Sequence, residues 1–324
     1  MNFKIGSFNL KNLGLAALSD SNSRNLEKIA EIIRSENFDI VALQEILSEG
    51  SAIFSKSYAK DTLLWYLGPD WDFRWADAES SGYDPRHEEY AFIWNTQRMG
   101  LTKTKLDDST VRVFNPRICR VKYDNMFRKP YYARFTPIDT FMEIRLLCVH
   151  TYFGKNDDEE DRKNRKREID TLLKEIYPQV SGKIYKNDLP SYTIVLGDYN
   201  AELQREWHDK LQRPKKPLYI EDITVAHNWD DMKILTVQDQ LTVLKNKQEE
   251  AEHDNTSSKE INRYSHNYDH FSYEDGDRYR ELNFKSKRID AVRKYENDDA
   301  EKYLKEVSNH LPIMLRFGWN VEEI

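Results

Sequence analysis

The chain has 324 residues and a mass of 38.6 kDa, with 49 Lys and Arg against 56 Asp and Glu, so its formal net charge is −7. Because a chain of pI 5.7 does not attract polyanions over long distances, the composition excludes a basic nucleic-acid coat protein and a polybasic membrane binder. Hydrophobic residues make up 39% and charged residues 32%, and the mean hydropathy is −0.82, which together indicate a globular protein with a sizeable core and a heavily charged surface.

The cysteine content and the amino terminus bear on the compartment. Only two cysteines are present, Cys119 and Cys148, so a disulfide framework is excluded and a reducing compartment is favoured. The amino terminus shows no basic patch followed by an apolar run, and no segment approaches the ~20 apolar residues that span a bilayer. We therefore expect a complete, cytoplasmic protein that does not bind membranes, with both cysteines structural rather than catalytic.

The hydrophobic pattern predicts strands and helices along the whole chain. In chain order the predicted strands are 3–10, 39–43, 90–94, 131–135, 144–149, 192–196, 268–273 and 313–317. The predicted helices are an amphipathic one with Ser23 as its N-cap, one over 52–66, and one over 157–176 whose charged residues form a solvated face. A polar stretch near 245–262 is expected to be a mobile insertion. No linker or repeat interrupts the pattern, so we predict a single α/β domain over residues 1–324.

Polar side chains recur at the ends of the predicted strands, which is where open α/β folds usually place their sites. They are Asn9, Glu45, His150, Asp198, Asn200, Asp269, Asn309 and His310. Each alone has an ordinary interpretation: Asn9 as a turn residue, Gly197-Asp198-Tyr199-Asn200 as an Asx turn, and each histidine as a satisfied core residue. The ordered set favours a functional site.

The residue types at these positions fit phosphodiester hydrolysis. A hard cation such as Mg²⁺ needs oxygen ligands, which Glu45 and Asp198 offer as carboxylates and Asn9 and Asn200 as amides; Mn²⁺ or Ca²⁺ accept the same donors. Such an ion neutralises charge that develops on phosphate oxygens and helps to generate hydroxide. Two histidines, His150 and His310, fit a general acid and base, or donors to the phosphate. We therefore expect a metal-dependent hydrolytic site.

The motifs FN at 8–9, QE at 44–45, His150, GDYN at 197–200, YD at 268–269 and SNH at 308–310 resemble the endonuclease/exonuclease/phosphatase superfamily over residues 3–317. Within it the chain looks most like deoxyribonuclease I, because KIGSFNLK at 4–11, EEY at 88–90 and FRKP at 127–130 also match that branch. The resemblance implies a four-layer α/β/β/α sandwich of two packed mixed sheets, with the site along one edge of the sheets.

The resemblance also implies a role for each matched residue. Glu88 is expected to orient His150 and Asp269 to orient His310, although the adjacent Glu89 fits the place of Glu88 equally well. Arg128 matches a residue that holds a phosphate, and Lys11 is a weaker candidate for that task. The expected catalytic residues are His150, His310, Glu88, Asp269 and Asp198; the expected metal ligands are Asn9, Glu45, Asp198, Asn200 and Asn309; and the expected phosphate or DNA contacts are Arg128, Lys11 and Asn200.

Two positions depart from the family pattern. Asn309 stands where the family carries the aspartate of a Ser-Asp-His tripeptide, so one negative charge is lost from the implied metal ligands and metal affinity should fall. A working natural variant, a weakened binder and an engineered inactive form are all compatible with this change. Leu47 stands where deoxyribonuclease I carries an arginine that enters the DNA minor groove; Arg86 is a candidate to replace it.

These features lead to one main functional hypothesis and two alternatives. The main hypothesis is a Mg²⁺-dependent, sequence-nonspecific DNA endonuclease, with DNA as the partner. The first alternative is a phosphatase or phosphodiesterase acting on a phosphoinositide, a phospholipid or a small nucleotide. The second is a member weakened by Asn309 that binds nucleic acid without turning it over.

Overall fold

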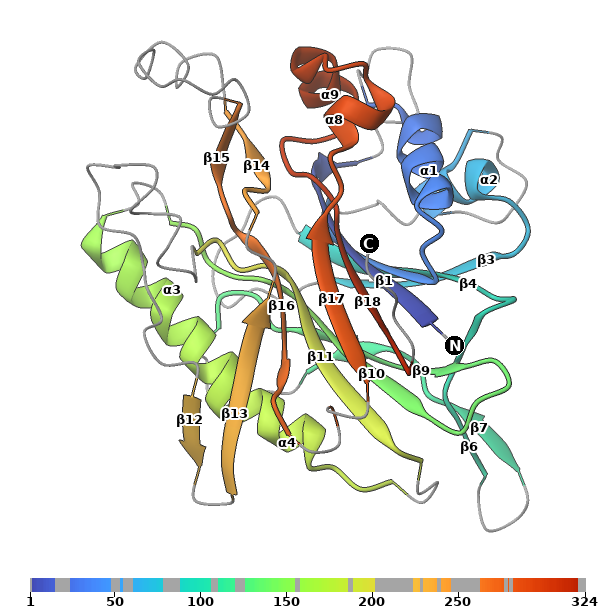
Figure 1. Cartoon of the computed structure of the whole chain (residues 1–324), viewed down its shortest axis with the longest axis vertical. Coiled ribbons are helices and arrows are strands. Elements are labelled where there is room, and N and C mark those ends of the chain that lie inside the picture. Colours follow the sequence, from blue (N-terminus) through green and yellow to red (C-terminus); the bar gives the residue numbers. More distant parts are fainter. Residues whose placement is uncertain are drawn as a thin grey trace.

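Figure 1 shows a computed structural model of the whole chain. The structure describes residues 2–14, 24–47, 53–54, 61–77, 88–105, 110–119, 126–154, 158–185, 189–201, 224–227, 230–237, 240–245, 263–276, 279 and 282–319. In this part of the chain two large mixed sheets pack face to face, and helices cover the outer face of each. The predicted sandwich of two mixed sheets is therefore confirmed.

The first sheet carries both termini of the described chain. Its strands, in spatial order, are β17 (Asn283–Arg288), β18 (Ile313–Gly318), β1 (Asn2–Leu13), β2 (Ile40–Leu47), β4 (Glu88–Asn95) and β3 (Trp71–Asp77). Only β1 and β2 run parallel, joined by a crossover through helix α1 (Leu26–Ser35). The other helices packed on its outer face are α2 (Leu63–Leu67), α8 (Ala291–Tyr295) and α9 (Ala300–Glu306).

The second sheet is formed by the middle of the chain. Its strands, in order, are β12 (Thr224–His227), β13 (Asp230–Val237), β16 (Asp269–Glu274), β11 (Ser191–Asp198), β10 (Glu143–His150), β9 (Tyr131–Pro137) and β5 (Met99–Leu101), with β8 (Arg117–Ile118) also paired to β9. Its outer face is covered by α3 (Glu159–Thr171), the π-helical turn η3 (Leu172–Ile176) and α4 (Tyr177–Ser181). Two small ribbons pair β14 (Val243–Leu244) with β15 (Tyr264–His266), and β6 (Lys103–Lys105) with β7 (Val111–Val113).

Alternation along the strands separates the layers. In β2, Val41 and Leu43 pack towards the helices, whereas Ile40 and Ala42 pack into the core between the sheets. All four side chains are fully buried, as expected for a nearly continuous apolar run in a strand covered on both faces. Because successive residues point to opposite faces, one short segment contributes to two cores and fixes its own register.

Strand pairing brings the predicted polar residues to one end of the sandwich. His150 lies opposite Asp198 in the parallel pair β10–β11, and Asp198 lies opposite Asp269 in the antiparallel pair β11–β16. In the first sheet, the β1–β2 register shifts beyond Asn9, and the β2–β4 register shifts beyond Leu43. These bulges bend the strand ends where site residues stand.

Two predicted helices differ from those observed. The predicted helix over 52–66 is reduced, within the described residues, to the five residues of α2, which Thr62 caps and Gly68 ends at a φ of 97°. The first helix starts two residues later than expected, with Asn25 as its N-cap; Ser23 lies outside the described residues. Residues 246–262 of the expected insertion also lie outside them, as does Arg86. None of the described helices is long and apolar enough to cross a membrane.

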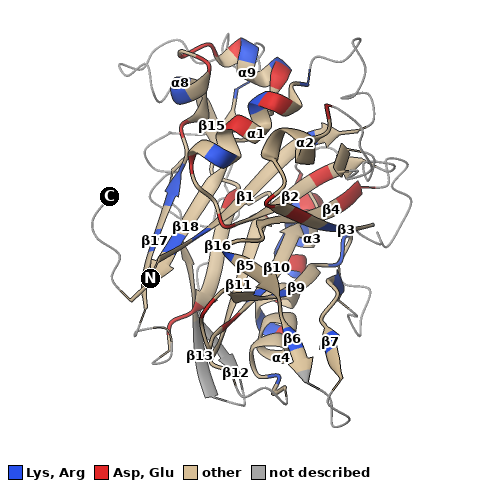
Figure 2. Cartoon of the chain, turned by 90° about the vertical axis from the view of Figure 1, so that its right-hand side faces the viewer, with Lys and Arg blue, Asp and Glu red and all other residues tan. Residues whose placement is uncertain are grey.

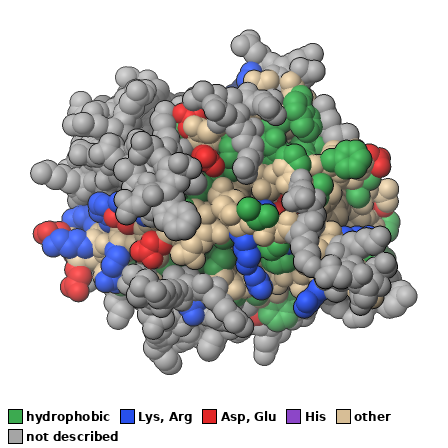
Figure 3. Space-filling model, turned by 90° about the horizontal axis from the view of Figure 1, so that it is seen from below, with side chains coloured by type: hydrophobic (Ala, Val, Ile, Leu, Met, Phe, Trp, Pro, Cys, Tyr) green, Lys and Arg blue, Asp and Glu red, His purple; other side chains and the backbone are tan. Residues whose placement is uncertain are grey.

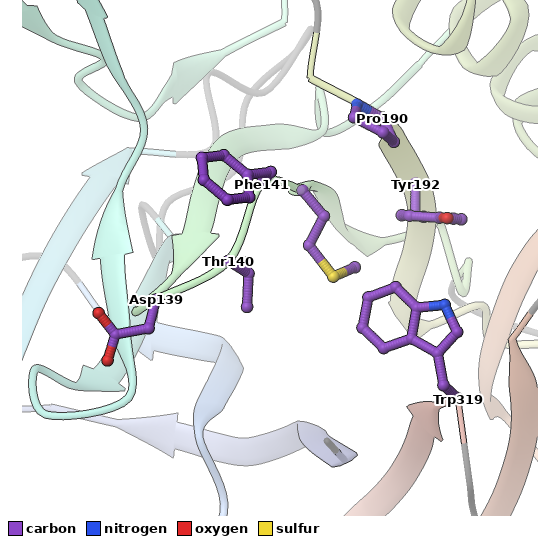
Figure 4. Close-up of a pocket in the computed structure, with 7 residues that line it drawn as sticks. Asp139, Thr140, Phe141, Pro190, Tyr192 and Trp319 are labelled. Carbon is purple, nitrogen blue, oxygen red and sulfur yellow. The ribbon is translucent and has the colours of Figure 1, made fainter.

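A pocket of about 430 Å³ opens at the end of the sandwich where β10 and β11 begin. Figure 4 shows its lining, which is mostly apolar: Asp139, Thr140, Phe141, Met142, Pro190, Tyr192 and Trp319. The polar cluster at the opposite ends of the same two strands does not line it, so the pocket is separate from the candidate site.

Candidate active site

An amide group links the two sheets at the centre of the site. The Nδ2 atom of Asn9 donates hydrogen bonds to Glu45 Oε1 at 2.8 Å and to Asp198 Oδ2 at 2.9 Å. Asn9 and Glu45 come from the first sheet and Asp198 from the second, so the contact spans the interface between them. Asn9 Oδ1, predicted as a metal ligand, instead accepts a hydrogen bond from the Lys11 backbone N–H at 2.9 Å.

The first histidine lies on one side of this centre. His150 Nδ1 lies 2.8 Å from Glu88 Oε2, and its Nε2 lies 3.8 Å from both Glu45 Oε1 and Asp198 Oδ2. Glu88, rather than Glu89, therefore meets this histidine. The other oxygen of Glu88 accepts a hydrogen bond from Arg128 at 2.7 Å. All three side chains, His150, Glu88 and Arg128, are buried.

The second histidine lies on the other side of Asp198. His310 Nδ1 lies 2.8 Å from Asp269 Oδ2, and its Nε2 lies 3.6 Å from Asp198 Oδ2. Ser308 Oγ donates to the Asn9 carbonyl at 2.8 Å and accepts from the His310 backbone N–H at 3.1 Å. The loop before β18 is thus fastened to β1, and Asp198 is shared between the two histidines.

Comparison with solved structures identifies this architecture. An endonuclease/exonuclease/phosphatase family protein from Bacteroides thetaiotaomicron superposes with a TM-score of 0.51 at 13% identity, covering 99% of both chains. A D. rerio TDP2 humanized by 14 mutations gives 0.53 at 12% identity, covering 98% of this chain and 99% of that one. The chain has the endonuclease/exonuclease/phosphatase fold.

Other comparisons set the limits of that statement. The mannosyl-6-phosphatase of Bacteroides thetaiotaomicron shares the fold at 14% identity and a TM-score of 0.52, covering 98% of this chain and 99% of that one. No protein-family profile and no curated protein sequence matches the chain. Neighbours of different named activities share this fold, so the resemblance to the superfamily is confirmed at the level of fold, and the deoxyribonuclease I branch stays a prediction.

The carboxylates at this end of the fold raise the pKa of both histidines. Burial by itself lowers the pKa of His310, but Asp269 and Asp198 outweigh it and raise the value to about 9. For His150, burial and the neighbouring Arg128 lower the pKa, and Glu88 and Asp198 reverse the balance so that the net shift is upward. Both imidazoles are therefore held in place by a carboxylate at Nδ1 and present Nε2 to the centre of the site.

Several oxygen and nitrogen atoms are close enough to share a cation. One ligand atom each from Glu45, His150 and Asp198 lie within 4.8 Å of one another, and so do one each from Asp198, Asp269 and His310. Asn309 Oδ1 is buried and accepts no hydrogen bond within the described part of the chain. A buried oxygen without a donor is costly unless a cation completes it, so these residues fit a hard divalent ion.

Two of the residues predicted to contact phosphate, Asn200 and Lys11, lie in different surroundings. Asn200, at a φ of 47°, donates its backbone N–H to Asp198 Oδ1 at 2.7 Å and its Nδ2 to the Thr151 carbonyl at 2.8 Å. Its side chain therefore ties the end of β11 to the residue that follows His150. Lys11, at a φ of 45° in the bulge of β1, is half-buried beside Glu45; burial lowers its pKa, and the nearby Arg24 lowers it further.

A buried charged face of α3, which sequence reasoning missed, supports the loops of the site. Glu168 accepts hydrogen bonds from the backbone N–H groups of Phe127 and of Tyr152, the latter at 2.6 Å. Arg165 donates to the Asn200 carbonyl, and Asp161 accepts from the Tyr152 hydroxyl at 3.1 Å.

The prediction of a merely solvated charged face is therefore wrong for three α3 residues, Asp161, Arg165 and Glu168, whose exposed fractions are 7%, 2% and 2%. Burial raises the pKa of the Glu168 carboxyl, while the two backbone hydrogen bonds oppose the shift. Their spacing of four and then three residues marks one helical face, and that spacing was the available signal in the sequence.

Proposed function

We propose that this chain is a divalent-metal-dependent phosphodiester hydrolase acting on DNA as a sequence-nonspecific endonuclease. One observation carries the proposal: two histidines, each with a carboxylate at 2.8 Å on Nδ1, direct their Nε2 atoms at the same Asp198 carboxylate. Glu45 lies beside it, at 3.8 Å from His150. A site with paired acids, oriented imidazoles and oxygen donors suits attack of water on a phosphate.

The chain's own residues supply proton transfer and charge. His310, with a pKa of about 9, is protonated near neutral pH and offers an N–H from Nε2 to a phosphate oxygen or a leaving group. Asp198 lies within 4 Å of both imidazoles and serves to orient the attacking water and accept its proton. Arg128, held by Glu88, adds a fixed positive charge for a phosphate oxygen.

A bound cation completes this set. Glu45 and Asp198, together with the buried Asn309 Oδ1, are the residues proposed to hold it, and Mg²⁺ is the expected ion. When bound, such an ion neutralises charge on the phosphate and lowers the pKa of a coordinated water. Asn309 leaves one negative charge fewer than an aspartate does, so metal affinity is expected to be lower than in an Asn309→Asp variant by about tenfold.

Nucleic acid is favoured as the substrate by one of the fold neighbours. D. rerio TDP2 has been solved in complex with a single strand DNA product, and it shares 12% identity and a TM-score of 0.53 with this chain. The mannosyl-6-phosphatase among the neighbours keeps the second candidate open, in which this site releases phosphate from a small monoester or lipid headgroup. The third candidate is a member that binds nucleic acid without turning it over, and the change that points to it is Asn309 in place of a carboxylate.

Incubation of supercoiled plasmid with the protein in Mg²⁺ or Mn²⁺, beside Asn309→Asp and Asn309→Ala variants, separates these candidates. We expect nicking that increases in the aspartate variant and falls in the alanine variant. Plasmid left intact by every form, together with phosphate release from a monoester, would replace the endonuclease with a phosphatase. DNA binding without turnover, even after Asn309→Asp, would instead support the quiet binder.

A further inference from the structure

Two buried arginines on the outer face of the second sheet share one carboxylate. Arg134 and Arg145 each pair with Glu143, at 2.9 and 2.6 Å respectively. The guanidinium carbon of Arg134 lies 3.5 Å from the centre of the Tyr185 ring and 5.1 Å from that of Phe114, so it is close to two aromatic rings. Both arginines are at most 4% exposed, and their combined charge exceeds that of their partner by one.

Two exposed cations extend this positive charge to the surface. Lys183 Nζ lies 5.4 Å from the centre of the Tyr185 ring, and the Arg117 guanidinium carbon lies 5.5 Å from that of Phe114. Neither forms an ion pair with any carboxylate that the structure describes. Both cations are close enough to Cys119 to affect its thiol. Burial raises the pKa of that thiol to about 12, and the charges of Arg117 and Lys183 oppose the shift.

The aromatic members remain accessible. Phe114 and Tyr185 are only partly buried, and Ile184, next to Tyr185, is 88% exposed. Figure 2 shows Lys and Arg positions on the ribbon around β6, β7 and α4, and Figure 3 shows Lys and Arg side chains beside hydrophobic ones on the face seen from below. Exposed cations interleaved with aromatic rings are the features with which proteins hold single-stranded nucleic acids: charges follow the backbone and rings stack on bases.

Strand β9 connects these residues with the candidate active site. Arg117 in β8 lies opposite Tyr132 in β9, and Tyr132 follows Arg128 by four residues. At about 3.3 Å per residue, an extended segment of that length covers roughly 13 Å. A flexible strand of a few nucleotides is long enough to span this distance.

We propose that Arg117, Lys183, Phe114 and Tyr185, here termed the basic cluster, lie over the buried Arg134 and form a second binding surface for single-stranded nucleic acid, beyond the candidate active site. The inference rests on the proposed nucleic-acid function and adds what selects the substrate: a polymer gains contacts that a small phosphate ester cannot reach. Single strands are specified because bases within a duplex do not expose their faces to Phe114 and Tyr185. A local surface of this kind is compatible with the net charge of −7.

The test is direct binding of a fluorescein-labelled single-stranded oligonucleotide of about 20 nucleotides, followed by fluorescence anisotropy, which needs no turnover. The double variant Arg117→Ala/Lys183→Ala removes two exposed cations and leaves the buried arginines in place. The matched control, Lys163→Ala/Arg293→Ala, removes two exposed cations from α3 and α8. We expect Kd to rise about tenfold in the first variant, and the slope of log K against log salt to fall by about 1.4, which is ~0.7 for each lost phosphate contact. The Kd of the control variant should stay within about twofold of the wild-type value.

A second readout separates this inference from the proposed function. The ratio of kcat/KM for the oligonucleotide to that for bis(p-nitrophenyl) phosphate is expected to fall about tenfold in the double variant only. Equal oligonucleotide Kd values for the double variant and the control would overturn the basic cluster, even if both substrates were cleaved. Failure to cleave either substrate, with selective loss of binding in the double variant, would instead overturn the proposed hydrolase and support the cluster.

Discussion

The two histidine–carboxylate pairs have the same contact length but different surroundings. In each, a carboxylate oxygen lies 2.8 Å from Nδ1. The carboxylate of Glu88 is shared with Arg128, whose positive charge opposes protonation of His150. No arginine is among the main influences on His310, and Asp269 and Asp198 raise its pKa to about 9. The two pairs have similar geometry, and the guanidinium of Arg128 beside one of them makes their electrostatic surroundings different.

This difference suggests a division of work. His310 keeps its proton near neutral pH, so it suits the role of a fixed donor or acid. The pKa of His150 is also raised, but Arg128 opposes that shift, so we assign to this imidazole the role of the group that accepts and releases a proton. Two acids and bases whose environments differ in this way make complementary roles possible within one site. The predictions below disrupt the shared element first and the individual pairs afterwards.

Replacement of the shared carboxylate should have the largest effect. Asp198→Asn removes the negative charge that lies 3.8 Å from His150 Nε2 and 3.6 Å from His310 Nε2, and it weakens the metal site as well. We expect kcat/KM to fall by about a thousandfold or more, measured by plasmid nicking or ester hydrolysis. Asp170→Asn, a change of the same kind on α3 beside Lys166 and Lys174, should keep near-normal activity. Equal losses in the two variants would show that the fold, not the site, is being damaged.

Removal of each orienting carboxylate should distinguish the two pairs. Asp269→Asn is expected to lower the pKa of His310 strongly and to reduce kcat by about a hundredfold, because a charged donor is lost. Glu88→Gln should lower the pKa of His150 even more, because Arg128 then opposes protonation with no carboxylate beside it to offset its charge, and should raise KM in addition by freeing Arg128. NMR titration of the histidines measures the two pKa values, and steady-state kinetics measures kcat and KM of each variant. Identical pKa changes in the two variants would contradict the proposed division of work.

Only part of this arrangement was available from the sequence. Buried strands such as 39–43 were predictable because their apolar runs are unambiguous, and polar residues at strand ends could be assembled into a site by order along the chain. The choice between Glu88 and Glu89 could not be predicted, because adjacent strand residues point to opposite faces and the sequence does not state which face meets His150. Nor could it show that Asn9 presents its amide nitrogen to Glu45, since that depends on contacts with the second sheet.

The inner face of α3 was missed for a different physical reason. Charged residues on a helix are usually solvated, because burying a charge without a partner is costly. Here Glu168 and Arg165 bond to backbone groups of loops that arrive from other strands, and such partners leave no pattern in the local sequence. Tertiary contacts, rather than periodicity, decided the burial of this face.

Loosening of that support should affect His150 more than His310. Glu168 is bonded to Tyr152, two residues after His150, and to Phe127, the neighbour of Arg128. Glu168→Gln supplies one acceptor oxygen where two N–H groups need one each. We therefore expect a lower kcat and a higher KM, which together reduce kcat/KM by about tenfold. The pKa of His150 should change while that of His310 stays, as NMR titration would show. The exposed Glu160→Gln is the matched control on the same helix, and a uniform loss of stability with both pKa values unchanged would reduce Glu168 to a purely structural residue.

The smallest expected effect is a pH-dependent contribution of His310 to stability. Its pKa is raised in the folded protein from 6.5 to about 9, so its stabilising effect is complete below 6.5 and disappears as the pH rises through 9. The shift corresponds to an order of magnitude of about 3 kcal/mol at most. Urea unfolding of the metal-free protein and of His310→Gln, at about pH 6 and again at about pH 9.5, measures it as a difference between the two forms. The gap in unfolding free energy should narrow at the higher pH. A gap that stays constant would mean that the Asp269 contact stabilises the fold by hydrogen bonding and packing alone, and the charge difference between the two histidines would lose its support.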